Sequence, residues 1–138
     1  MSHATVFPTL GYADAPKAIE FLMNAFAFER HALYAGDDGT VHHAELRSGN
    51  GLVMLGSASG DFAATRGGGG GVYVVVDDPD AHAERAQAAG AEIVRAPYDT
   101  DYGSREYSAR DPEGNQWHFG TYQPLGYDHA AEEAKATA

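Results

Sequence analysis

Hydrophobic and polar residues are spaced so that they predict a strand, a helix and a set of short strands in the first half of the chain. Residues 5–12 are rich in strand formers, and Asp14 and Pro16 follow as a helix N-cap and a first-turn proline. Apolar residues then recur at helical spacing and predict one buried helix face: Ile19, Leu22, Met23 and Phe26. Glycine-containing turns separate three further strands, expected at 30–34, 41–47 and 52–55.

The second half repeats this order of elements. A β-branched strand at 72–76 leads to Asp78 and Pro79, which again suit a helix start, and Gly90 suits a left-handed helix stop. Further strands are expected at 92–96, 105–110 and 116–122. A spacing of 64 residues separates Asp14 from Asp78, and also relates the glycines of the two halves to each other.

Two copies of one unit predict a single pseudo-twofold domain, because stacked repeat arrays need at least about three copies. We expect this α+β domain at residues 1–126. It comprises a first βαβββ half at 5–60, a glycine-rich joint at 61–71 and a second half at 72–124. A tail follows at 127–138.

Composition narrows the classes of function. The chain has 138 residues, of which 43% are hydrophobic and 11% aromatic, as in a globular domain. The formal net charge of −11 provides no basic surface for nucleic acid, and no apolar run is long enough for a membrane span. The acidity favours cationic small molecules or basic partners, or serves only solubility. The absence of cysteine excludes thiolate metal sites and fits a cytoplasmic location.

Residues 110–122 read RDPEGNQWHFGTY, and residues 78–81 read DPDA after a β-branched strand. In this order, and with the internal repeat, the chain resembles the vicinal oxygen chelate superfamily over residues 6–122, in its glyoxalase and bleomycin-resistance branch. The resemblance implies a curved, mainly antiparallel sheet around a cleft, with helices on the convex side. It also implies a homodimer with the cleft shared between subunits.

The resemblance places the four metal-ligand positions of the superfamily at Phe7, Met54, Gly71 and His118. The internal spacing pairs the first of these with the third, and the second with the fourth. Only His118 carries a side chain suited to the hard divalent ions of these enzymes. We therefore expect no metal cofactor at these positions.

Strand alternation sorts the side chains into core and cleft. Trp117 and Phe119 are expected in the core. The residues predicted to line a ligand cleft are Phe7, His43, Glu45, Met54, Glu106, Ser108, Gln116 and His118. Tyr98 and Tyr102 either border that cleft or cover the core. His118 lines the cleft without a chemical role, contacts the ligand or acts as a general base, so no catalytic residue is assigned.

Three functions follow from these expectations. The first is a metal-independent small-molecule binding protein that resembles bleomycin-resistance proteins and has a cationic antibiotic as a candidate ligand. The second is a lyase, isomerase or dioxygenase with a relocated divalent metal at His43, Glu45 and His118. The third is a non-catalytic scaffold or regulatory domain. We expect a small-molecule ligand, and neither nucleic acid nor membrane as a partner.

Overall fold

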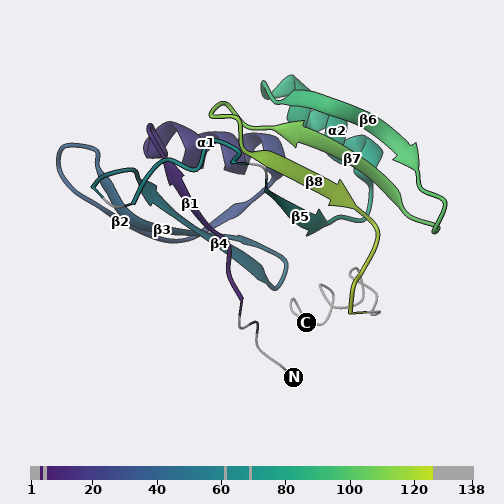
Figure 1. Cartoon of the computed structure of the whole chain (residues 1–138), viewed down its shortest axis with the longest axis horizontal. Coiled ribbons are helices and arrows are strands. Elements are labelled where there is room, and N and C mark those ends of the chain that lie inside the picture. Colours follow the sequence, from purple (N-terminus) through teal and green to yellow (C-terminus); the bar gives the residue numbers. More distant parts are fainter. Residues whose placement is uncertain (1–3, 5, 61, 69, 126–138) are drawn as a thin grey trace.

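The computed structural model describes residues 4, 6–60, 62–68 and 70–125. The expected tail at 127–138 lies outside these residues. Two four-stranded sheets and two helices repeat one order of elements, which confirms the predicted α+β fold of two βαβββ modules (Figure 1). The two sheets stay separate and do not close into a barrel.

The first half forms a sheet with the strand order β1-β4-β3-β2, in which β1 runs parallel to β4 and the other pairs are antiparallel. Its elements are β1 (Thr9–Tyr12), α1 (Ala15–Phe26), β2 (Glu29–Ala35), β3 (Val41–Ser48) and β4 (Gly51–Ser57). The first strand is shorter than predicted and begins after Pro8, which has no backbone N–H for a sheet.

The second half forms a sheet with the equivalent order β5-β8-β7-β6 and the same strand directions. Its elements are β5 (Gly71–Val75), α2 (Pro79–Ala88), β6 (Glu92–Asp99), β7 (Arg105–Arg110) and β8 (Gln116–Gly120). Strand β6 is longer than predicted, because the chain passes Pro97 through a register shift between Arg95 and Tyr98 and then resumes pairing.

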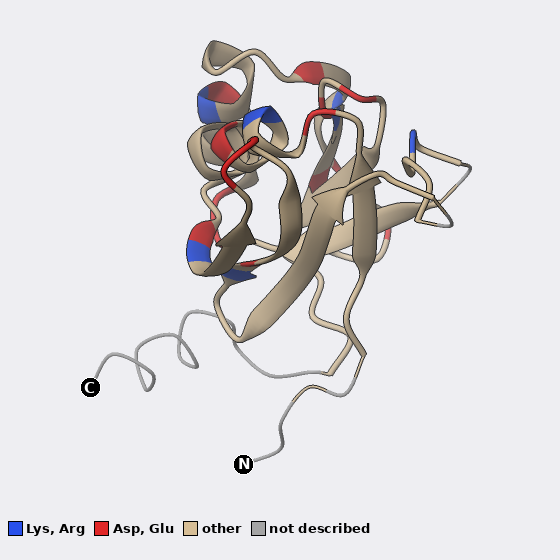
Figure 2. Ribbon diagram, turned by 90° about the vertical axis from the view of Figure 1, so that its left-hand side faces the viewer, with Lys and Arg blue, Asp and Glu red and all other residues tan. Residues whose placement is uncertain are grey.

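Both helices begin as the sequence predicts. The Asp14 carboxylate accepts from the Lys17 N–H, and the Asp78 carboxylate accepts from the Ala81 N–H. Figure 2 shows the helices banded with acidic and basic residues, whereas long stretches of the strands carry none. No helix in the described part of the chain is long and apolar enough to cross a membrane.

The core lies between the helices and the covered face of each sheet, and both halves contribute to it. Phe26, at the end of α1, packs its ring 5.4 Å from Trp117 and 4.8 Å from Phe119, measured between ring centroids. Both partners lie on β8 of the other half and are fully buried. The prediction that Trp117 and Phe119 face the core is confirmed, and the first helix therefore helps to support the second sheet.

The turn between β7 and β8 joins the two halves through a buried carboxylate. Asp111 is 5% exposed and accepts from the Tyr12 hydroxyl at 2.6 Å and from Trp117 Nε1 at 3.1 Å. Burial, together with the neighbouring Asp111 carboxylate, raises the pKa of Tyr12, so this hydroxyl stays protonated and donates. Glu113 of the same turn accepts from the backbone N–H groups of Ala13 and Asp14 at the start of α1.

The two halves resemble each other more in their strand pairing than in their amino-acid sequence. The 64-residue spacing holds between β1 and β5 and between β4 and β8, where Thr9 faces Met54 and Tyr73 faces His118. Where β2 begins and β3 ends the spacing is 63 residues, since Glu29 pairs with Arg47 and Glu92 pairs with Arg110, so the single offset expected from the sequence is corrected there. At the other end of these strand pairs the spacing is again 64 residues. Different register shifts in the two hairpins account for the change.

Candidate functional site

Each sheet has one face against the helices and one open face. On β8, Trp117 and Phe119 are buried while Gln116 and His118 are half-buried on the opposite side. On β4, Val53 is buried and Met54 lies on the open side in the same way. The alternation that was read from the sequence therefore assigns the two faces correctly.

The eight residues predicted to line one cleft are divided between the two sheets. Glu106, Ser108 and His118 line a pocket on the second sheet, and His43 and Met54 line a hollow on the first sheet. Phe7, Glu45 and Gln116 belong to neither lining. Within one chain, the structure thus brings together three of the predicted residues on one sheet and two on the other.

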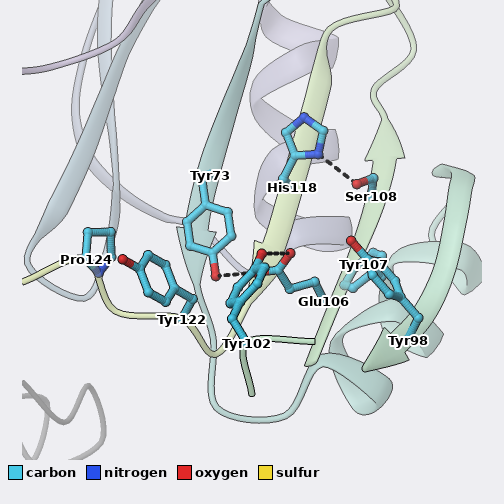
Figure 3. A pocket seen from close by; sticks show the side chains of 9 residues that line it. All are labelled: Tyr73, Tyr98, Tyr102, Glu106, Tyr107, Ser108, His118, Tyr122 and Pro124. Atoms are coloured by element: carbon cyan, nitrogen blue, oxygen red, sulfur yellow. Dashed lines mark hydrogen bonds between the residues drawn. The ribbon is translucent and has the colours of Figure 1, made fainter. Parts of the chain in front are cut away.

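The second-sheet pocket has a volume of about 340 Å³ and lies on the open face of β5, β7 and β8 (Figure 3). This volume is at the lower end of the range of about 300–1,000 Å³ that is usual for small-molecule sites. Its lining residues are Tyr73, Tyr98, Tyr102, Glu106, Tyr107, Ser108, His118, Tyr122 and Pro124. The lining is therefore mainly aromatic, with one carboxylate and one imidazole.

Glu106 is the only carboxylate among these lining residues, and hydroxyl groups surround it. Tyr73 donates to its Oε2 at 3.3 Å, and Tyr102 donates to both carboxylate oxygens at 3.2 Å. Ser104, which is 4% exposed, donates to Oε2 at 3.1 Å. Figure 3 shows the two tyrosine hydroxyls pointing at this carboxylate.

Both tyrosines are held in the protonated, donating form. Burial and the nearby Glu106 carboxylate raise the pKa of Tyr73 to about 12. The pKa of Tyr102 is raised as well, by desolvation and by its hydrogen bond to Glu106. The backbone makes room for this cluster at Gly120, where a β-carbon would lie 2.5 Å from Cγ of Glu106 and 2.6 Å from Oη of Tyr73.

His118 forms the other end of the second-sheet pocket. Its Nδ1 and the Ser108 hydroxyl are 2.7 Å apart, which fixes the plane of the imidazole ring. A β-carbon at position 71 would lie 2.9 Å from its Nε2, so Gly71 leaves room for the ring. The ring can exchange a hydrogen bond with a ligand through Nε2.

The first-sheet hollow, with a volume of about 360 Å³, lies over β3 and β4 and includes His43, Met54 and Phe62 in its lining. Beside it, Nε2 of His43 and Oε2 of Glu45 are 2.8 Å apart. Nε2 of His31 lies 3.8 Å from the other oxygen of Glu45. This hollow therefore has the imidazole of His43 in its lining, together with apolar and hydroxyl side chains, while the carboxylate partner Glu45 lies outside it.

A catalytic metal ion needs about three protein ligands, which the predicted positions do not supply. Of the four positions that the resemblance suggests, Phe7 and Gly71 have no ligating atom and Met54 has only a thioether. His43 and Glu45 lie on the first sheet, whereas His118 lies on the second. In the described ranges, no group of three or more His, Cys, Asp or Glu side chains is arranged to hold a metal ion.

Sequence reasoning assigned Glu106, Ser108 and His118 to the cleft but did not find the tyrosine cluster. Strand alternation does not point to Tyr73 or Tyr122 as site residues, and it does not decide whether Tyr102 borders the cleft or covers the core. One signal was available: five of the eight tyrosines of the chain fall between positions 73 and 122. All five border the second-sheet pocket, although the side chain of Tyr107 itself is fully buried and pairs with His82 in the core.

Comparisons with known proteins give a consistent result. The sequence profile described as Glyoxalase/Bleomycin resistance protein/Dioxygenase superfamily matches residues 2–119. An uncharacterised protein of Mycobacterium bovis is 35% identical over 126 residues, which cover 86% of this chain and 82% of that protein.

Solved structures are similar as well. TioX from Micromonospora sp. ML1 is 34% identical with a TM-score of 0.71, and the match covers 85% of this chain and 94% of TioX. Glyoxalase I from Zea mays has the same TM-score at 21% identity, over 88% of this chain and 45% of the maize protein. The maize likeness bears on the fold alone.

Proposed function

Because the chain belongs to the glyoxalase/bleomycin resistance protein/dioxygenase superfamily, we propose that it is a binding protein that holds a small cationic organic molecule without a metal ion. The ligand occupies the second-sheet pocket. A cationic antibiotic remains the candidate that the sequence suggested.

The observation that carries this proposal is the charge balance of the second-sheet pocket. Its walls are tyrosine rings, and Glu106 supplies a negative charge, while the lining contains no lysine or arginine. Aromatic faces and a carboxylate both attract organic cations. His118, fixed by Ser108, supplies a polar contact that orients the ligand at the other end.

We propose that the protein forms a homodimer. Each open face carries exposed aromatic side chains, such as Tyr34 on the first sheet and Tyr102 on the second, both 62% exposed. A second copy that sets its first sheet over the second-sheet pocket would cover both faces and bring His43 toward His118. Sedimentation of the purified protein at micromolar concentration should then give a dimer, and a monomer at that concentration would contradict this part.

The competing function is a lyase, isomerase or dioxygenase with a relocated metal, and the pair of His43 and Glu45 is the observation in its favour. Metal analysis of the purified protein separates the two functions. We expect less than stoichiometric Zn²⁺, Ni²⁺, Mn²⁺ or Fe²⁺, and no change in thermal stability when these ions or EDTA are added. A stoichiometric metal ion whose removal abolishes ligand binding would overturn the proposal.

The binding proposal is tested with methylene blue, a planar organic cation. At a hundredfold excess over its Kd, a ligand of the folded state stabilises by about 2.7 kcal/mol, which raises Tm by several degrees in calorimetry. Glu106→Gln should weaken this effect. Glu84→Gln, which removes the same charge from the outer side of α2, is the matched control. An equal effect of both variants would argue against the pocket.

A further inference from the structure

The hydrogen bonds around Glu106 restrict the kind of cation that this pocket accepts. We propose that the cationic group seated at Glu106 is a fully alkylated ammonium without N–H bonds, and not a primary ammonium. This inference rests on the proposed function, since it concerns the same pocket, and it names the chemical class of the ligand's head group.

The first argument is that hydroxyl groups already occupy one oxygen of Glu106. Oε2 accepts from Tyr73 and Ser104, and the single hydroxyl hydrogen of Tyr102 is shared between Oε2 and Oε1. A primary ammonium would have to displace one of these hydroxyls to donate to Oε2, and it would compete with Tyr102 at Oε1. An alkylated ammonium donates none, so it is attracted by the charge without disturbing the network.

The second argument is that tyrosine rings border the carboxylate. Tyr102 and Tyr122 stand edge to face, with centroids 5.8 Å apart, and Figure 3 shows Tyr73 on the same side of Glu106 as these two rings. Electron-rich ring faces around a negative charge favour a large, weakly hydrated cation. A primary ammonium is a compact and strongly hydrated charge, so it loses more of its hydration energy here.

The third argument concerns which rings are available. The guanidinium carbon of Arg95 lies 3.5 Å from the centroid of Tyr98, so that ring already has a cation on one face. Arg105, the neighbour of Glu106 in sequence, is held by Asp80 at 2.7 Å and by Asp99 at 3.0 Å. Tyr107 is fully buried and stacks on Phe119 in the core. Tyr73, Tyr102 and Tyr122 are therefore the rings left to receive the head group beside Glu106.

The experiment compares three probes with one aromatic ring. Benzyltrimethylammonium carries the alkylated cation, benzylammonium the primary cation, and neopentylbenzene the same shape without charge. Calorimetric titration of the full chain should give an affinity for benzyltrimethylammonium that is about tenfold higher than for either of the other two. Equal or tighter binding of benzylammonium would overturn the inference.

Two substitutions test the cause of this preference. Glu106→Gln should reduce the affinity for benzyltrimethylammonium about fivefold to tenfold and leave that for neopentylbenzene within about twofold, while Glu84→Gln changes neither. Tyr102→Phe keeps the ring but removes the hydroxyl that the two oxygens of Glu106 share, so benzylammonium should gain affinity relative to benzyltrimethylammonium. An unchanged ratio in Tyr102→Phe would contradict the role given to the hydroxyls.

The two proposals fail in different ways. Binding of methylene blue that is lost in Glu106→Gln, without any preference for benzyltrimethylammonium over benzylammonium, overturns only the head-group assignment. If neither methylene blue nor any benzyl probe binds the second-sheet pocket, the proposed function itself is wrong.

Discussion

On the first sheet Thr9 lies opposite Met54, and at the same place on the second sheet Tyr73 lies opposite His118. The neighbouring strand continues the contrast, since Glu45 pairs with Met54 whereas Ser108 pairs with His118. The backbone register of the two sheets is equivalent, but their open faces differ in chemistry. One scaffold therefore carries a hollow lined by hydroxyl, imidazole and apolar side chains on one sheet and a tyrosine–carboxylate pocket on the other.

The two halves also differ in the turn between their last two strands. The turn between β7 and β8 contains Asp111 and Glu113, which bind Tyr12 and the start of α1. The turn between β3 and β4 has serine, glycine and asparagine at 48–51 in place of these carboxylates. The DPEGN segment at 111–115 therefore joins the two modules, a role that the corresponding first-half turn does not share through carboxylates.

The largest expected effect is the loss of the inter-module carboxylate. Asp111→Ala leaves the Tyr12 hydroxyl and Trp117 Nε1 buried without their acceptor, so we expect a loss of about 3 kcal/mol in the free energy of unfolding. Ser48→Ala, in the corresponding first-half turn, should cost less than about 0.5 kcal/mol. Urea unfolding measures both, and a cost below about 1 kcal/mol for Asp111→Ala would refute the asymmetry.

The next effect concerns two glycines at equivalent positions. In Gly120→Ala the new methyl group collides with Glu106 and Tyr73, so affinity for benzyltrimethylammonium should fall about tenfold, or about 1.4 kcal/mol. In Gly56→Ala the closest atom is the Val41 carbonyl oxygen at 3.2 Å, and the loss should be smaller, about threefold or less. Calorimetric titration measures the affinity of both variants. Equal losses of affinity would contradict the proposed difference between the open faces of the two sheets.

A pH effect distinguishes the two helices, because α2 carries His82 where α1 carries the buried Ala18. Burial lowers the pKa of His82 below 6.5, although its hydrogen bond to the Phe26 carbonyl opposes the shift. The unfolded chain then binds the proton more readily, so stability is complete above about pH 6.5 and falls as the pH is lowered. Urea unfolding between pH 7.5 and 5 should show this decline.

His82→Gln is the variant that tests the assignment of this decline. It removes the titrating group, and the stability profile between pH 6.5 and 5 should become flatter than that of the unmodified protein. If the slope is the same in both proteins, His82 is not its source.

The smallest effect should be equal in the two halves. Arg47 binds Glu29 at 2.7 Å, and Arg110 binds Glu92 at 3.0 Å, at equivalent places on the two sheets. All four side chains are at least 40% exposed, so double-mutant cycles should give about 0.2–1 kcal/mol for each pair. A coupling energy clearly larger in one half would show that the equivalence of the scaffolds is incomplete.

Much of the fold could be predicted because its signals are local. Asp14 and Asp78 mark both helix starts, and alternation places Trp117 in the core and His118 on the open face. Strand ends were less predictable, since they depend on pairing with distant strands. The site could be predicted only in part: Glu106, Ser108 and His118 share one pocket, while His43 and Met54 line a hollow on the other sheet.

By itself, the sequence determined the order of the elements and their covered faces, because residue type and spacing fix these. Only the tertiary structure decided that Phe26 supports the second sheet, that Asp111 reaches Tyr12 across 99 positions, and that tyrosines from β5 and the segments flanking β7 and β8 surround Glu106. Such contacts join residues far apart in the chain, and their geometry is set by how the two modules pack.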